Sequence, residues 1–535
     1  MKIYLNYFKW CLLHPLSILQ SLKKKLIKLH YGRYNHIYYP QNVLNLVNKY
    51  INNTNKYNKI KNDSFYKIKH NFLFNKDSEI FEKYHRFEYF IEQKGDKQIF
   101  NRIKKWYKIY LPAISNYKNS LIWESYTVSY RIVNAISISI KLKNDVLKDY
   151  IKNEVIFLLQ KLEYFHNGIS NHILKNSQAI IYAGVFFKDN QLMNIGFKIL
   201  FSAEKKLINN EGLLRESSSS YQLLNTALYL DLYIFLNKNK IKEKKQVFNT
   251  LKKMLNASNF FNHNNKLVKF GDLTPDKKTS YLEKKIFFTP FYKSYLLAGP
   301  KNKFVKKIGN FIKINKHNSN LFVKFNKKTS DNFPTHENED NFHFNYFHKK
   351  NLILTGLNRY NYNTFKGALA DSNNLLTINN YGHLINLSRF YHNDFIKSKN
   401  LAKLFNNKKP SLEINTNCFK FIDKHIKWKR NLIVNNNSLV ISDSLKSSKI
   451  LKKKIFLHFS PFFYIHKAFE DKFILKSKKK NITVCMKIKK NINTKIIKKI
   501  TCFTESYGEK SKNISFIFEN NKSKNFSNII EIKII

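Results

Sequence analysis

The chain contains the stretch Ser170-Asn171-His172-Ile173-Leu174, in which polar residues stand directly before a run of helix-like periodicity. Apolar or small residues recur at spacings of three and four over residues 173–184, which predicts a helix that begins at this stretch. A second polar stretch, Arg215-Glu216-Ser217-Ser218-Ser219-Ser220-Tyr221, precedes the same kind of pattern over residues 221–235. Its serines are candidates for the residue that caps the helix start. Polar groups therefore gather at two helix starts.

The pattern changes from helical to strand-like near residue 305. Few glycines or prolines interrupt the helical periodicity between about residues 70 and 260, whereas short apolar runs separated by Asn, Lys or Ser clusters follow Pro300. These runs lie at residues 320–325, 341–347, 351–354, 438–442, 454–459, 481–486 and 514–518. Several alternate apolar with polar residues, which is typical of an antiparallel β-sandwich. Because 535 residues exceed the size of a single compact core, we expect a multidomain α+β chain.

The chain is strongly basic. Its 95 Lys and Arg exceed its 36 Asp and Glu by 59, giving a net charge of +59. Such a surface attracts polyanions, which include nucleic acids, acidic polysaccharides and anionic lipids. The lysines are nevertheless spread along the whole chain together with Asn and Ile, as in proteins encoded by AT-rich genomes. No RNA-binding, zinc-finger or helix-turn-helix signature accompanies the charge, so nucleic acid is not an expected partner.

Export and membrane signals are weak. The N-terminal stretch has a Lys and a short apolar run, but His14-Pro15 interrupts it and no small-residue cleavage site follows. A degenerate export signal and an amphipathic first helix fit it equally well. We therefore expect a periplasmic or cell-envelope protein, with the cytoplasm as the alternative. No run approaches the roughly eighteen apolar residues of a membrane span, and the oligomeric state is not indicated.

Further motifs extend the two opening stretches. Pro334-Thr335-His336-Glu337-Asn338-Glu339-Asp340 begins the β-rich half, and Trp123-Glu124-Ser125-Tyr126-Thr127-Val128-Ser129-Tyr130-Arg131 stands in the helical half. With Glu82-Lys83-Tyr84-His85-Arg86-Phe87, these motifs keep a common order between about residues 80 and 375. In that order and spacing the chain resembles the heparinase II/III-like polysaccharide lyases.

The resemblance implies an N-terminal incomplete (α/α) toroid, a C-terminal antiparallel β-sandwich and a cleft between them. On this basis we expect a helical extension at residues 1–70, the toroid at residues 71–304 and the sandwich at residues 305–535. It also implies an acidic, uronate-containing polysaccharide as substrate and cleavage by β-elimination.

Four residues have the chemistry that this reaction requires, and we expect them to converge on the cleft. Asn171 and His172 can donate hydrogen bonds to the uronate carboxylate, which stabilises the charge that develops when the neighbouring proton leaves. Tyr221 and His336 can supply the base and the acid. The structural alternatives are a helix cap for Asn171, a satisfied histidine for His172, a core aromatic for Tyr221 and a loop histidine for His336.

A second group of residues is expected to bind or support the substrate. It comprises Trp123, Tyr126, Arg131, Glu216, Tyr360 and Tyr362. An arginine can hold a carboxylate or sulfate with two hydrogen bonds, and aromatic rings can stack on sugars. The alternative for the helical residues is a buried polar network that joins helices. Either Tyr360 or Tyr362 can supply a second phenol, and the sequence does not choose between them.

No metal or other cofactor is expected. Many relatives carry a metal in the sandwich, and the resemblance places its ligands at Asn338, Thr355 and Ser372. These side chains are poor ligands for zinc or manganese. Their joint replacement also favours a rival interpretation, a non-catalytic or assembly-associated relative that binds cell-surface polysaccharide.

Overall fold

The computed structural model describes residues 41–54, 83–91, 95–111, 121–165, 168–295, 304–326, 336–360, 367–383, 385–386, 392–393, 398–406, 408–479, 481–491 and 493–535. The predictions for the N-terminal stretch and for Tyr362 lie outside these residues. The described chain forms two compact units. Among the described residues, the helical unit comprises those from 41 to 208 and Leu228–Phe248, and the β-rich unit comprises Asn209–Ala227 and those from 249 to 535. This division by packing differs from a division by secondary structure, because the start of helix α11 (Ser219–Lys238) belongs to the β-rich unit.

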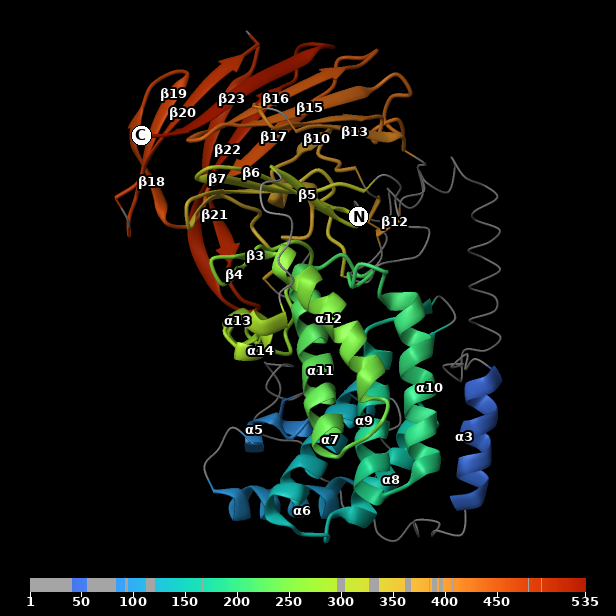
Figure 1. Cartoon of the computed structure of the whole chain (residues 1–535). Helices are drawn as coiled ribbons and strands as arrows, with labels where there is room; N and C mark the ends of the chain where they lie inside the picture. Colours follow the sequence, from blue (N-terminus) through green and yellow to red (C-terminus); the bar gives the residue numbers. More distant parts are fainter. Residues whose placement is uncertain are drawn as a thin grey trace. The chain divides into compact units, whose positions relative to one another are not determined.

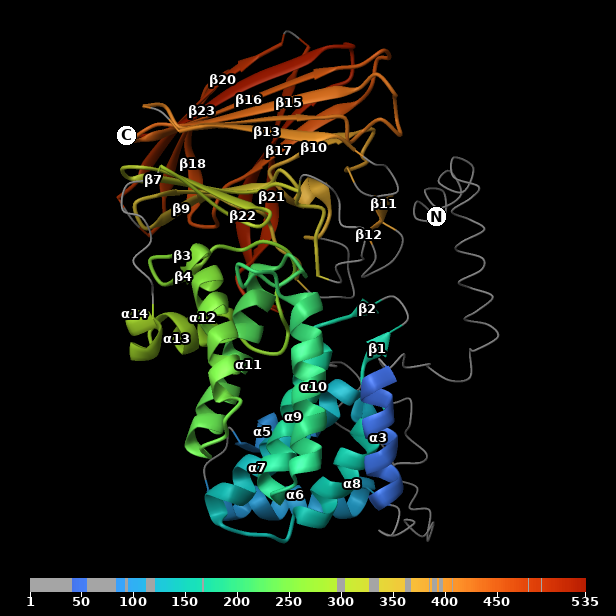
Figure 2. The same ribbon diagram turned by 45° about the vertical axis from the view of Figure 1, so that its right-hand side comes forward.

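The helical unit consists of consecutive helices packed against one another (Figures 1 and 2). They are α3 (Gln41–Thr54), α5 (Glu88–Ile91), α6 (Asp96–Tyr110), α7 (Ser125–Leu142), α8 (Lys148–Leu159), α9 (His172–Phe187) and α10 (Asn190–Leu207), with the short 3-10 helix η2 (Leu121–Trp123) and the strand pair β1 (Tyr164–Phe165) and β2 (Gly168–Ile169). Helix α7 packs on α6, α8 and α9, and α10 packs on α9 and α3. The helix starts near Asn171 and Tyr221 are therefore confirmed.

Two glycines set the distance between α9 and α10. A Cβ atom at Gly184 would lie 2.5 Å from the Met193 side chain, and one at Gly196 would lie 2.7 Å from the Ile181 side chain and 3.0 Å from its backbone nitrogen. No real Cβ tolerates such contacts. The close packing of the two helices therefore depends on the absence of side chains at these positions.

The β-rich unit contains three larger antiparallel sheets. Five strands form the first sheet: β5 (Val305–Ile308), β6 (Phe311–Lys316), β7 (Ser319–Lys324), β8 (Phe344–His348) and β9 (Asn351–Leu354). The second, in spatial order, is β10 (Leu376–Ile378), β17 (Lys453–His458), β22 (Lys510–Asn520) and β21 (Lys495–Thr504). The third is β13 (Asn400–Phe405), β14 (Ser411–Thr416), β15 (Lys427–Val434), β16 (Ser438–Lys446), β23 (Phe526–Ile534), β20 (Thr483–Lys490), β19 (Lys472–Ser477) and β18 (Phe463–Ala468).

Smaller elements complete this unit. They are α12 (Lys244–Phe260), which begins in the helical unit, the hairpin of β3 (Asn262–His263) and β4 (Lys266–Leu267), α13 (Thr279–Phe287), α14 (Pro290–Tyr295), the 3-10 helix η3 (Ala370–Ser372) and the strand pair β11 (Ile385–Asn386) and β12 (His392–Asn393). Helices α11 and α12 are joined where Thr226 and Ser258 hydrogen-bond at 2.9 Å. Figure 1 shows the three larger sheets as stacked layers within this unit.

One apolar core joins the three sheets. It includes Val323 and Tyr346 from the first sheet, Leu457 from the second, and Trp428 and Ile530 from the third, all at most 2% exposed. Alternating burial along β15 and β14 follows the sequence pattern, with every second residue buried. The predicted multidomain α+β architecture with antiparallel sheets is therefore confirmed.

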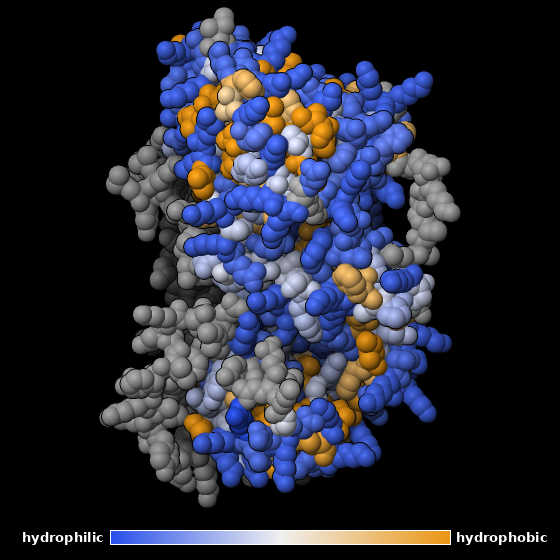
Figure 3. Space-filling model, turned by 90° about the vertical axis from the view of Figure 1, so that its left-hand side faces the viewer, coloured by the Kyte–Doolittle hydropathy of each residue, from blue (hydrophilic) through white to orange (hydrophobic). Residues whose placement is uncertain are grey.

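The hydrophilic character of the surface agrees with the high content of charged residues. On the face drawn in Figure 3 hydrophilic residues predominate, and apolar residues gather in separate patches. Within the described part of the chain, no helix is both long and apolar enough to cross a membrane.

The glycine contact between α9 and α10 gives a first test. Alanine favours a helix interior over glycine by about 1 kcal/mol, yet Gly196→Ala is expected to lower the free energy of unfolding by about 1–3 kcal/mol, because its methyl group meets Ile181. Exposed Lys198 on the same helix is the control, and Lys198→Ala should change stability by less than about 0.5 kcal/mol. Urea unfolding measures both. A stabilised Gly196→Ala protein would contradict the described packing.

Candidate active site

Tyr221 and His336 lie in direct contact within the β-rich unit. Their ring centroids are 3.7 Å apart with 13° between the planes, so the phenol and the imidazole are stacked. Tyr221 is 4% exposed and His336 is 7% exposed. Two residues that stand far apart in sequence therefore form one buried pair of stacked rings.

A carboxylate adjoins this pair. Asp272 Oδ2 lies 3.5 Å from His336 Nδ1 and 3.3 Å from Arg359 Nη1. The backbone repeats the association, because the Asp272 N–H donates to the His336 carbonyl at 3.0 Å. Asp272 is 1% exposed, and its second oxygen, Oδ1, has no hydrogen-bond partner among the described residues. The carboxylate therefore lies within the distance of a direct electrostatic contact with the imidazole.

The serine run holds the backbone of the segment that carries this carboxylate. Ser218 Oγ donates to the Asp272 carbonyl at 2.7 Å and accepts from the Tyr221 N–H at 3.2 Å, as expected of a helix cap. Ser219 exchanges hydrogen bonds with the Phe270 backbone. Gly271, which stands between Phe270 and Asp272, has φ +70°. A Cβ at this position would lie 2.9 Å from the His336 carbonyl oxygen. Only glycine allows this approach without strain.

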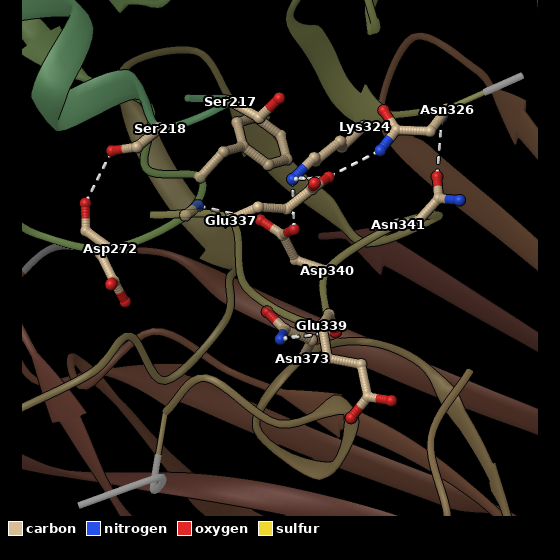
Figure 4. Close-up of polar contacts among 12 residues, drawn as sticks. Ser217, Ser218, Asp272, Lys324, Asn326, Glu337, Glu339, Asp340, Asn341 and Asn373 are labelled. Atoms are coloured by element: carbon tan, nitrogen blue, oxygen red, sulfur yellow. Dashed lines mark hydrogen bonds and ion pairs between the residues drawn. The ribbon is translucent and has the colours of Figure 1, made fainter. Parts of the chain in front are cut away.

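A buried ion-pair cluster fixes the segment that carries His336 (Figure 4). The ammonium of Lys324, which is 0% exposed, lies 2.5 Å from Asp340 Oδ1 and 3.0 Å from Glu337 Oε1. Asp340 Oδ2 accepts from the Gly271 N–H at 2.9 Å, and Asn326 Nδ2 donates to Glu337 Oε1 at 2.6 Å. Strand β7, the His336 segment and the Gly271 turn are thus joined through one buried cation.

The cluster shifts the pKa values of its members. Burial raises the pKa of Asp340 to about 6, and the Lys324 ammonium opposes this rise only in part. Burial alone would lower the pKa of Lys324, but the carboxylates of Asp340 and Glu337 outweigh it and raise that pKa.

In the helical unit, His172 has a carboxylate and a ring as neighbours. His172 Nδ1 lies 2.6 Å from Glu163 Oε2, and its ring stacks on Tyr126 with centroids 4.0 Å apart. The Arg86 guanidinium lies 5.0 Å from the Tyr126 ring. Asn171 is buried and precedes helix α9, but its side chain makes no capping hydrogen bond; Ser170 Oγ accepts from the His172 N–H instead. Asn171 thus occupies the N-cap position of α9 without a side-chain capping hydrogen bond.

Arg131 and Trp123 are buried in the helical unit. The Arg131 guanidinium pairs with Glu154, donates to the carbonyls of His85 and Ile122, and lies 4.8 Å from the Trp123 ring. Arg131 is 0% exposed and Trp123 1%. Arg131 and Trp123 therefore have the contacts of a buried polar network that joins helices, which was the alternative to a role in substrate binding.

The remaining candidates lie in the β-rich unit. Glu216 is 2% exposed and directly precedes the serine run. Tyr360 is half-buried, and the Lys510 ammonium lies 3.7 Å from its ring centroid. The joint convergence of Asn171 and His172 with Tyr221 and His336 remains a prediction, since the first two belong to the helical unit.

Comparison of the whole chain with known proteins gives structural matches alone. No protein-family model and no curated protein matches it. A heparinase III crystal structure superimposes with a TM-score of 0.65 at 15% identity, covering 84% of this chain and 77% of the other. A second heparinase III gives 0.63 at 15%, covering 98% and 90%. The heparan sulfate lyase HepC from Pedobacter heparinus, as a mutant, gives 0.58 at 13%, covering 94% and 84%.

The chain has the fold of heparinase III. At these identities the likeness concerns the fold, which is the fold expected from the motif order. The resemblance drawn from the sequence is confirmed at that level.

The positions that the resemblance assigns to a metal in the heparinase III fold do not fit one here. Asn338, Thr355 and Ser372 are buried and neutral. The Ser372 hydroxyl accepts from the Gly367 N–H, and Asn338 Oδ1 has no hydrogen-bond partner among the described residues. Nearby His343 accepts the Asn374 N–H on Nδ1, so its neutral ring carries the proton on Nε2, and burial lowers its pKa well below the usual range. The amide of Asn338 and the hydroxyls of Thr355 and Ser372 do not suit zinc or manganese.

Sequence reasoning missed Asp272 and Glu163. Asp272 follows a glycine in a loop that has no helical or strand-like period, and Glu163 stands in the turn before β1. A glycine followed by an acidic residue between two predicted elements was the available signal for Asp272. Only the fold shows that it adjoins His336.

The raised pKa of Asp340 predicts a pH dependence of stability. Because its folded value of about 6 exceeds the ordinary 3.8, Asp340 takes up a proton more readily in the folded state. Its contribution is fully present below the ordinary value and is lost as pH rises through the folded value. The stability of the wild type relative to Asp340→Asn should therefore increase as pH falls from about 7 to about 4. Urea unfolding of both proteins across this range measures the difference.

Exposed Asp145 supplies the control. Asp145→Asn, at a side chain that is 71% exposed, shows the general effect of removing one carboxylate from the chain. A difference between wild type and Asp340→Asn that stays constant or shrinks on acidification would contradict the raised pKa.

Proposed function

We propose that the protein is a polysaccharide lyase that cleaves an acidic, uronate-containing polymer by β-elimination. The observation that carries the proposal is the stacked pair of Tyr221 and His336 with Asp272 beside the imidazole, in a chain with the heparinase III fold. A phenol and an imidazole are a suitable base and acid for removing a proton and protonating a leaving oxygen.

The proposed reaction has two parts. Tyr221, as phenolate, takes the proton from the sugar carbon next to the carboxylate; the C–H electron pair forms the new double bond, and the bond to the glycosidic oxygen breaks. The leaving oxygen takes a proton from the phenol or from His336, so that atoms and charges balance. Asn171 and His172 donate to the uronate carboxylate, because the charge that develops on it must be stabilised. Asp272 orients His336, and Arg359 holds Asp272.

The basic composition supports a polyanionic substrate, because a net charge of +59 attracts such polymers. Solved structures with this fold include a heparan sulfate lyase and a chondroitin AC lyase, so sulfated uronate polymers belong in a substrate screen. The proposed compartment is the periplasm or cell envelope, with the cytoplasm as the alternative.

A second candidate is a non-catalytic relative that binds cell-surface polysaccharide. The neutral side chains at Asn338, Thr355 and Ser372 favour it, because the loops that a metal would hold are free to depart from catalytic geometry. The ultraviolet absorbance of the conjugated double bond distinguishes the two, since only a lyase generates it. Binding of a uronate polymer without such absorbance would favour the second candidate.

Tyr221 and Asn171 give the direct test of mechanism. Tyr221→Phe keeps the ring and its stacking but removes the hydroxyl, so turnover should be abolished while substrate binding stays nearly intact. Asn171→Ala should reduce turnover by about 10²–10³-fold, the usual effect of removing one donor to a developing anion. The kinetics of both variants are compared on whichever polymer the screen identifies, with thermal melts to exclude unfolding. A folded Tyr221→Phe protein with a near-normal rate would remove the tyrosine from the mechanism.

Asp272 is tested as a positioning residue. Asp272→Asn removes the negative charge beside His336 and should lower kcat by about 10²-fold or more, as expected when acid–base catalysis fails, with KM nearly unchanged. The matched control is Asp276→Asn, another buried aspartate in the same segment, whose side chain contacts Thr274. An equal loss in both variants, or a change in KM alone, would show a purely structural effect.

A further inference from the structure

A second polar cluster lies in the helical unit. Glu124, Glu163 and His172 each bring one ligand atom to within 4.8 Å of the other two. Glu124 directly precedes α7, Glu163 directly precedes β1 in the turn after α8, and His172 opens α9. Two carboxylates and an imidazole therefore meet where three connections of the helical unit come together.

The backbone around the cluster is held firmly. The Glu163 N–H donates to Asn176 Oδ1 at 3.0 Å, and Asn176 Nδ2 donates to Ser129 Oγ at 2.9 Å. Ser125 Oγ bonds to the Lys161 carbonyl. These contacts fix the turn before β1 against helices α7 and α9. The three ligands thus come from a prearranged frame rather than from mobile side chains on a surface.

Glu163 has an unsatisfied oxygen in this frame. The residue is 8% exposed, and its Oε2 points at His172 Nδ1 at 2.6 Å. Its other oxygen, Oε1, is buried and has no hydrogen-bond partner among the described residues. A buried carboxylate oxygen without a donor is costly.

We propose that Glu124, Glu163 and His172 bind a divalent transition-metal cation, of which manganese and zinc are the best matched. An imidazole ligand selects these ions over magnesium and calcium, which prefer oxygen ligands alone. The cation would supply Glu163 Oε1 with the positive partner that it lacks. Three protein ligands leave coordination positions for water or a ligand oxygen.

This site differs from the positions that the resemblance assigns to a metal. Those positions belong to the β-rich unit and hold Asn338, Thr355 and Ser372, whereas the cluster belongs to the helical unit. The expectation that the chain needs no metal rested on the β-rich positions alone. The proposal concerns cation binding and does not depend on lyase activity.

The test is calorimetric titration of the full-length, tag-free protein after chelator treatment. Manganese and zinc chloride should each bind at one site per chain, and magnesium and calcium chloride at least about tenfold more weakly. Glu163→Gln and Glu124→Gln should each weaken manganese binding by at least about tenfold, because each removes a charged ligand. Glu124 is half-buried, so its variant keeps the test valid if Glu163→Gln fails to fold.

Two control variants test whether the cation binds at this cluster or elsewhere in the chain. Glu204→Gln removes a carboxylate of the same unit that bonds Tyr229 outside the cluster, and it should bind manganese as the wild type does. Asn338→Ala should also leave binding unchanged. Absence of saturable binding by the wild type, undiminished binding by both Glu163→Gln and Glu124→Gln, or loss of binding in Asn338→Ala would each overturn the proposal.

Discussion

The geometry of the β-rich unit around His336 depends on one buried cation, the ammonium of Lys324. Taking a lysine out of water costs several kcal/mol unless opposite charges compensate, and here Asp340 and Glu337 do so from a single short segment. The segment cannot move away from β7 without leaving that charge unpaired. Because the segment begins with His336, the ion pair also limits where the imidazole can lie.

A second set of contacts, made by the serine run and Gly271, also fixes the surroundings of His336. The serine run ties the start of α11 to the loop of Gly271 and Asp272, and Gly271 donates its N–H to Asp340. Asp340 therefore links both constraints: one oxygen holds the cation and the other holds the turn. Tyr221, Asp272 and His336 are brought together by backbone contacts, and the stacking of two rings is a consequence of that frame.

The sequence could predict elements whose pattern is local. The helices that begin beside Asn171 and in the serine run followed from spacings of three and four, and the strands β7, β9, β16, β17, β20 and β22 followed from short apolar runs. The run at residues 341–347 shows the limit, because strand β8 begins only at Phe344. Phe342 has φ +72°, a left-handed conformation outside that of regular strands, and its burial comes from tertiary packing. The contact of Asp272 with His336 was out of reach for the same reason, because contacts between distant segments leave no period in the sequence.

The Lys324 cluster explains how the segment around Asn338 can be ordered without metal ligands. A metal ion in a β-sheet domain organises loops by drawing several anionic or neutral ligands to one positive charge. In this chain the segment from His336 to Asp340 lacks a metal-binding residue at Asn338 but supplies two carboxylates to an ammonium. An ammonium pairs with carboxylates in a less demanding geometry than a transition metal. A lysine is also part of the chain and does not have to be bound from solution. The order of the segment from His336 to Asp340 therefore does not require a metal ion.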